Sequence, residues 1–77
     1  MTSRHHLDAR RLLCPMPVIR VQQRIESLAS GDELEVICTD PGAKHDIPAW
    51  CRVHDHELLA IEEDERDGEI RILLRVK

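Results

Sequence analysis

Aromatic residues are almost absent from this chain of 77 residues, which has no phenylalanine, no tyrosine and one tryptophan. Proteins that bind single-stranded nucleic acid stack the bases on aromatic side chains, and this chain offers no such platform. Its formal net charge of −4 at pH 7 gives no general attraction for phosphates. Both features argue against direct, sequence-specific binding of nucleic acid.

Long apolar runs are missing as well. The longest mostly apolar stretch, residues 12–19, contains Pro15 and Pro17 and is too short to cross a bilayer. The opening residues, MTSRHH, lack the apolar core of a secretory signal. We therefore expect a cytoplasmic protein that does not bind membranes.

The three cysteines, Cys14, Cys38 and Cys51, are an odd number and cannot form a closed set of disulfides. In the cytoplasm we expect them to be reduced. Cys38 and Cys51 fall on the apolar sides of a predicted strand and a predicted helix, so both are interpreted as buried and inert. Cys51 and His54 form one pair with metal-ligand spacing and no second pair follows, so we predict no metal and no cofactor.

The length is that of one small domain, predicted over residues 1–77 with residues 1–5 flexible. Such a chain buries only about 60–65% of its unfolded surface, which leaves no room for a deep, enclosed active site. Charged residues make up 34% of the chain and hydrophobic residues 42%, a balance typical of a folded globular domain.

Prolines and glycines divide the chain into six predicted elements. Strands are expected over residues 6–9, 33–39, 57–62 and 69–76, and helices over residues 15–29 and 43–54. Pro48 lies inside the second helical pattern, so that helix either begins near Ile47 or is kinked. Trp50 is expected to anchor this helix on the sheet, and the acidic turn within residues 62–69 is expected to close a solvated hairpin.

The order β-α-β-α-β-β predicts an α+β fold. Two helices would cover one face of a four-stranded mixed sheet, which makes a two-layer α/β sandwich, and the other face would be polar. In this arrangement the alternating residues Leu34, Val36 and Cys38 face the helices.

Cys14 is the one candidate for chemistry, because it stands directly before Pro15. The residue before a proline is pushed into an extended conformation, which is also that of a helix N-cap. Cys14 is therefore expected at the tip of the first helix, where free N–H groups such as that of Met16 could reach its sulfur. The helix dipole would then lower the pKa of the thiol by about 0.2–1.5 units.

Two interpretations of Cys14 stay open at this point. A free cysteine is most often a small buried hydrophobe, whereas a rigid helix tip would expose it as a nucleophile. The spacing reveals no acid–base partner for hydrolysis, and there is little room for a substrate pocket. An exposed, activated thiol without a pocket favours a carrier that holds a group covalently and hands it to partner proteins.

A Cys-Pro-x-Pro box occupies residues 14–17 and follows the pair Leu7-Asp8. Further along the chain stand Gly31-Asp32, Thr39-Asp40-Pro41-Gly42, Asp46-Ile47-Pro48-Ala49-Trp50-Cys51 and His56-Glu57-Leu58. With these segments the sequence resembles the TusA family of sulfur-carrier proteins, also called SirA-like, over residues 7–77. The resemblance implies that Cys14 carries sulfur as a persulfide and that Pro15 and Pro17 shape its loop.

The resemblance also implies partner proteins. A cysteine desulfurase or a rhodanese-like protein would donate the sulfur. The acceptor would serve tRNA 2-thiolation, sulfur oxidation or molybdenum-cofactor assembly. The protein would be a carrier with sulfurtransferase-type chemistry more than a stand-alone enzyme, and the sequence does not distinguish sulfur from selenium.

Two residues depart from the family's usual pattern. Arg11 stands where glycine is common, which affects the loop before Cys14, and Met16 replaces a frequent glutamate in the box, which affects the choice of partner.

A basic docking rim for acidic partner surfaces or for tRNA-bound complexes is expected around Cys14, and the alternative is a solvated helix face. The basic residues are Arg10, Arg11, Arg20 and Arg24, and Met16 adds an apolar contact. The alternative function is a regulatory or interaction module that binds through this rim, with Cys14 as a redox sensor.

Overall fold

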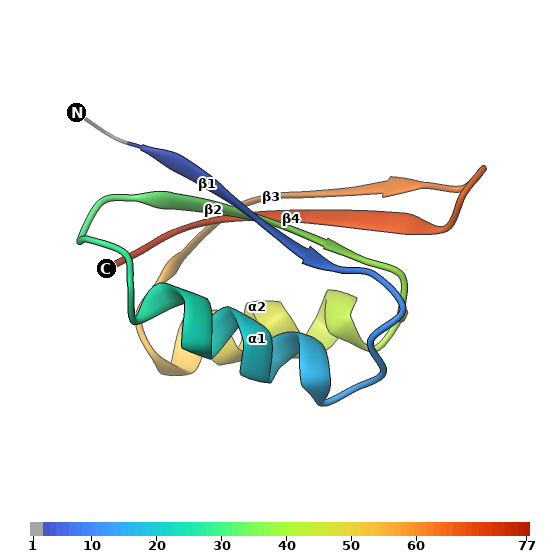
Figure 1. The fold of residues 1–77 in the computed structure, drawn as a ribbon, viewed down its shortest axis with the longest axis horizontal. Coiled ribbons are helices and arrows are strands. Elements are labelled where there is room, and N and C mark those ends of the chain that lie inside the picture. Colours follow the sequence, from blue (N-terminus) through green and yellow to red (C-terminus); the bar gives the residue numbers. More distant parts are fainter. Residues whose placement is uncertain (1–2) are drawn as a thin grey trace.

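The computed structural model describes residues 3–77, in which four strands form one sheet and two helices pack against one face of it (Figure 1). The strands are β1 (Arg4–Ala9), β2 (Glu33–Cys38), β3 (Glu57–Asp64) and β4 (Glu69–Arg75). The helices are α1 (Met16–Ile25) and α2 (Ala43–Val53). The predicted α+β sandwich is confirmed.

The sheet has the strand order β1-β2-β4-β3 and is mixed, as predicted. β1 runs parallel to β2, while β4 is antiparallel to both β2 and β3. Ala9 pairs with Cys38, and Cys38 pairs with Ile70, so β1 and β2 finish at the same end of the sheet. We call this the loop end, because the chain leaves it for both helices (Figure 1).

The core fills the space between the sheet and the helices. Leu34, Val36 and Cys38 are buried, as their alternation in β2 predicts. The other buried apolar residues are Ala9, Pro17, Val21, Ala43, Ile47, Cys51, Ile70, Ile72, Leu74 and Val76. The burial of Cys38 and Cys51 confirms the interpretation of both as structural residues.

β1 begins earlier than its sequence pattern predicts. Arg4 pairs with Glu33 and His5 with Leu34, so these two residues, expected to be flexible, belong to the first strand. The same expectation for residues 1 and 2 lies outside the described residues.

α1 ends at Ile25 and does not reach residue 29. The N–H groups of Ser27 and Leu28 bond to the carbonyl oxygens of Arg24 and Ile25, three residues back. This tighter winding is typical of the frayed last turn of a helix, and it closes the element before Gly31.

α2 begins at Ala43, as the helical pattern predicts, and passes through Pro48, so the alternative start near Ile47 is wrong. Pro48 has no N–H to offer the carbonyl of Lys44, which costs one helical hydrogen bond. The helix continues because Ala43, Ile47 and Cys51 form one buried stripe against the sheet.

Trp50 lies on the flank of α2 and is half-buried, packed against the edge of the core. Its ring centroid is 4.7 Å from that of His54 and 5.1 Å from that of His56. Trp50 thus packs against the core as predicted, and its ring also lies beside those of two histidines.

The sheet face away from the helices is polar, as predicted. Arg75 reaches across it to both Glu33 and Glu57, with N–O distances of 3.2 Å, and Arg4 lies 3.1 Å from Glu33. Exposed pairs of this kind contribute only about 0–1 kcal/mol each. Beyond the helices, the β3–β4 hairpin extends at the loop end and carries its acidic turn into solvent (Figure 1).

Candidate functional site

The parallel pairing of β1 with β2 assembles the candidate site. Both strands finish at the loop end, so the connection from β1 to α1 and the connection from β2 to α2 lie side by side. Arg11 in the first connection donates its N–H to Thr39 Oγ1 in the second, at 2.9 Å. Cys14 therefore faces residues that stand far from it in the sequence.

Asp40 holds the backbone at Cys14. Its Oδ2 accepts the N–H of Cys14 at 2.7 Å, and its Oδ1 accepts the N–H of Gly42 at 3.1 Å. Gly42 is close to the cysteine, because a methyl group built on it would lie 3.6 Å from Cys14 Cβ. One carboxylate thus fixes both the loop that carries the sulfur and the turn that opens α2.

The Cys14 side chain is exposed, so the interpretation as a buried hydrophobe is wrong. Its sulfur donates a hydrogen bond to Oδ2 of Asp46, which lies in the first turn of α2. This bond raises the pKa of the Cys14 thiol, and partial desolvation and the charges of Asp46 and Asp40 act in the same direction.

The expected lowering of the Cys14 pKa by the α1 dipole is therefore wrong. α1 begins at Met16, with Pro15 as its N-cap, and no side chain caps it. The N–H of Met16 is taken by the carbonyl oxygen of Leu13 at 2.8 Å and does not reach the sulfur. Cys14 stands just outside the helix, and two nearby carboxylates raise the pKa of its thiol.

Three apolar side chains surround the loop on the solvent side. Leu13, Met16 and Ile19 are 75%, 38% and 38% exposed. Met16 and Ile19 lie one turn apart on α1, and Leu13 precedes the cysteine directly. Large exposed apolar groups beside a reactive atom are typical of a contact surface for another protein. Sequence reasoning identified Met16 in this role but missed Leu13 and Ile19.

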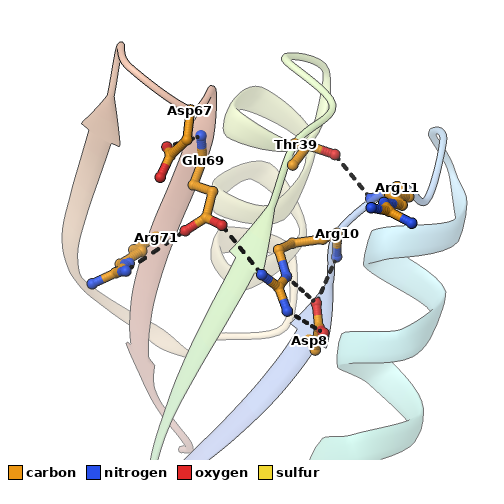
Figure 2. A network of polar contacts seen from close by, with 7 residues as sticks. All are labelled: Asp8, Arg10, Arg11, Thr39, Asp67, Glu69 and Arg71. Atoms are coloured by element: carbon orange, nitrogen blue, oxygen red, sulfur yellow. Dashed lines mark hydrogen bonds and ion pairs between the residues drawn. The ribbon is translucent and has the colours of Figure 1, made fainter.

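The basic docking rim is not assembled as predicted. Arg10 lies on the polar face of the sheet, where its Nε is 3.0 Å from Asp8 and its Nη1 is 3.3 Å from Glu69 (Figure 2). Arg24 donates to Ser27 Oγ at 2.6 Å and contacts the ring of His5. Both guanidinium groups are thus engaged within the domain, since other residues of the fold supply their partners.

Arg11 and Arg20 remain exposed at the loop end and on α1. Arg11 has a φ of 67°, the left-handed region in which glycine is the least strained residue. Glycine would adopt this backbone conformation with the least strain, and Arg11 adopts it as well.

The sequence reasoning did not place Asp40 and Asp46 beside Cys14, although both stand in the segments that carry the resemblance. Asp40 lies 26 residues and Asp46 32 residues beyond Cys14, so spacing alone gives no sign of contact. The available signal was the topology, because parallel strands bring the connections that follow them to the same end of the sheet.

The other two thiols are unsuited to exchange. Burial raises the pKa of Cys38 and of Cys51 to about 11, with the charge of Asp40 contributing at Cys38. Within residues 3–77 no three His, Cys, Asp or Glu side chains are grouped to hold a metal ion. In the same part of the chain no helix is long and apolar enough to span a membrane.

This architecture is shared with proteins described as SirA-like. The crystal structure of a SirA-like protein from Desulfitobacterium hafniense superimposes with a TM-score of 0.81, covering 92% of this chain and 95% of that chain. The two sequences are 19% identical, so the likeness concerns the fold alone.

Sequence comparison then defines the family. The family model described as sulfurtransferase TusA matches residues 5–76. YrkI of Bacillus subtilis is 46% identical over 67 residues, which are 87% of this chain and 88% of YrkI. The sulfur carrier protein TusA of Pseudomonas putida is 48% identical over 58 residues, which are 75% of this chain and 72% of that protein. The chain belongs to the TusA family, which confirms the resemblance drawn from the Cys-Pro-x-Pro box.

Proposed function

We propose that this protein is a sulfur carrier that holds a persulfide on Cys14. The observation that carries the proposal is the position of Cys14, the one exposed thiol among three cysteines. Pro15 and Pro17 shape the loop beneath it, with Pro17 buried against the core. The naming of its relatives as sulfur carriers supports the same role.

Loading is an exchange between a thiolate and a persulfide. The Cys14 thiol loses its proton to solvent, and the thiolate attacks the terminal sulfur of the donor persulfide. The bond between the two donor sulfurs breaks, and its electron pair leaves with the donor cysteine as a thiolate, which a proton then neutralises. Cys14 now carries the terminal sulfur with its hydrogen, and no external oxidant is consumed.

Unloading repeats the exchange in the other direction. An acceptor thiolate attacks the terminal sulfur, and Cys14 leaves as a thiolate and is protonated again. A cysteine desulfurase or a rhodanese-like protein would act as donor. The acceptor would serve tRNA 2-thiolation, sulfur oxidation or molybdenum-cofactor assembly.

Intact mass spectrometry tests this assignment. The protein is incubated with a cysteine desulfurase and cysteine, or with glutathione persulfide, and the expected product is heavier by one sulfur atom. Cys14→Ser should take up no sulfur, while Cys38→Ala and Cys51→Ala should load like the wild type. Loading of Cys14→Ser, or failure of the wild type with every class of donor, would overturn the proposal.

A further inference from the structure

We propose that Asp46 is a positioning residue that holds Cys14 as an S–H group in the free carrier, and that a sulfur donor releases the thiolate by placing a cationic side chain against the Asp46 carboxylate. The inference rests on the proposed function in one respect only, the identity of the partner as a sulfur donor. The contact between Cys14 and Asp46 stands independently of it.

The direction of the hydrogen bond between Cys14 and Asp46 determines which protonation state of the thiol it favours. A carboxylate can only accept a hydrogen bond, so the Sγ–H of Cys14 must be the donor to Asp46 Oδ2. This bond exists with the thiol and is lost with the thiolate, whose charge would also be repelled by the carboxylate. Asp46 therefore favours the unreactive form of the sulfur, since the thiolate is the nucleophile.

The charges that reach the sulfur from the neighbouring elements are both negative. Asp46 approaches from α2, and Asp40 from the turn between β2 and α2. Two of the nearby cations have other partners: on α2, Lys44 Nζ is 2.9 Å from Glu63, and before α1, Arg10 is paired with Asp8 and Glu69. On α1, Arg24 donates to Ser27 Oγ. The remaining cationic groups and histidine on these elements are Arg11, Arg20, His45 and Arg52, all exposed to solvent.

The hairpin that extends from the loop end adds a further excess of negative charge. Residues 62–69 hold one cation, Arg66, and six acidic residues: Glu62, Glu63, Asp64, Glu65, Asp67 and Glu69. A partner that approaches the loop end thus meets this acidic hairpin as well as the exposed Arg11 and Arg20, and the hairpin attracts and orients cationic groups. An arginine or lysine of the donor would pair with Asp46, remove the acceptor of the S–H bond and stabilise the thiolate directly.

The consequence is a carrier that reacts mainly in a complex. In free solution the S–H form protects Cys14 from oxidation and from exchange with unrelated disulfides, because both reactions need the thiolate. After unloading, the departing Cys14 thiolate regains its proton beside Asp46, and the reverse reaction is suppressed.

The test measures the ionisation of Cys14 without any sulfur transfer. The rate of alkylation by iodoacetamide is followed from pH 6 to pH 11, and mass spectrometry confirms that the adduct is on Cys14. In Asp46→Asn we expect the midpoint of the profile to fall by about one unit, at the lower end of the 1–3 units typical of a close charge. Asp46→Glu should restore most of the wild-type midpoint.

The matched control is Asp55→Asn, which removes the same charge at the other end of α2. Asp55 has a φ of 62°, a conformation that asparagine adopts readily, so the fold should be unaffected.

A second measurement uses the wild-type protein alone and follows the Cβ chemical shift of Cys14 as the pH is raised. Its midpoint should lie above that of the same cysteine in a peptide of residues 11–17.

The donor's cation is tested by salt dependence. Loading from a cysteine desulfurase should slow with rising salt more steeply in the wild type than in Asp46→Asn. Loading from glutathione persulfide at pH 7 should be faster in Asp46→Asn than in the wild type.

An unchanged or raised midpoint in Asp46→Asn, or an equal shift in Asp55→Asn, would overturn the role of Asp46. Equal salt dependence in both proteins would overturn the role of the donor's cation. If the midpoint shifts as expected but no donor loads Cys14, the proposed function fails and the role of Asp46 stands.

Discussion

Asp40 is the residue that joins the two halves of the site. Its two oxygens accept the N–H groups of Cys14 and Gly42, so one side chain links the loop before α1 to the turn before α2. Hydrogen bonds to a charged acceptor are stronger than those between neutral groups. The position of the sulfur thus depends on a carboxylate that never touches it.

At this scale we predict that Asp40→Ala destabilises the protein by about 1–3 kcal/mol, because two N–H groups lose their acceptor. Urea denaturation monitored by circular dichroism measures the change. Asp40→Asn keeps one acceptor oxygen and should lose less. If Asp40→Ala unfolded at the same urea concentration as the wild type, the prediction would be wrong, because water would replace the carboxylate as acceptor without any loss of stability.

Individual residues of the site were predictable only where local geometry identifies them. Cys14 could be found because Pro15 restricts the residue before it. Asp46 could not be found, because its contact with Cys14 joins residues 32 positions apart. The direction of the Cys14 pKa shift was consequently predicted wrongly, since the nearby charges were unknown.

Among the elements, β4 is the strand on which the sheet depends, since it lies between β2 and β3. Its inward residues Ile70, Ile72 and Leu74 are almost fully buried. Leu74 pairs with Leu34 on one side and with Leu58 on the other, so its side chain belongs to the packing of three strands.

We therefore predict that Leu74→Ala destabilises the fold by about 2–5 kcal/mol, a loss typical of buried leucines. Leu13→Ala, at a position 75% exposed, should change stability by less than about 0.5 kcal/mol. Leu13→Ala should instead slow loading by a protein donor while loading by glutathione persulfide stays unchanged. Thermal melting and the loading assay measure the two effects, and a stability loss of equal size in both variants would contradict the assignment of Leu13 to the surface.

The number and order of the elements could be predicted, because alternation and helical periodicity reflect burial on one face of each element. Their ends could be predicted to within two residues, except for the last turn of α1, which ends at Ile25 and not at residue 29. The helical pattern around Pro48 suggested a break, yet the buried stripe of Ala43, Ile47 and Cys51 carries the helix through it. Tertiary packing outweighs the missing hydrogen bond at that position.

For the molecule as a whole, several titratable groups make the stability of the fold depend on pH. Partial burial lowers the pKa of His56, whose Nδ1 accepts the N–H of Lys77 at 3.1 Å. The hydrogen bond from Arg10 lowers the pKa of Asp8 to about 2, and the N–H of Ala29 lowers that of Asp32. In each case the unfolded chain binds the proton first, so protonation favours unfolding.

We predict that the melting temperature falls in two steps as the pH is lowered. The first step comes below about pH 6.5, as His56 is protonated in the unfolded chain, and the second between about pH 4 and pH 2, as Asp8 and Asp32 are protonated. Melting followed by circular dichroism at a series of pH values measures both steps. His56→Gln should lose less stability than the wild type between pH 7.5 and pH 5 and the same amount below pH 4. Parallel curves in the upper range would exclude His56 as the cause.

The parallel register of β1 and β2 has one further consequence. Arg4 and Arg75 both pair with Glu33, at the end of the sheet opposite to the one from which the chain leaves for its helices. β1 thus begins, and β4 finishes, at the end of the sheet opposite the loop end (Figure 1). A fusion partner or a solid support attached at the C-terminus should therefore leave the thiol of Cys14 accessible to partner proteins.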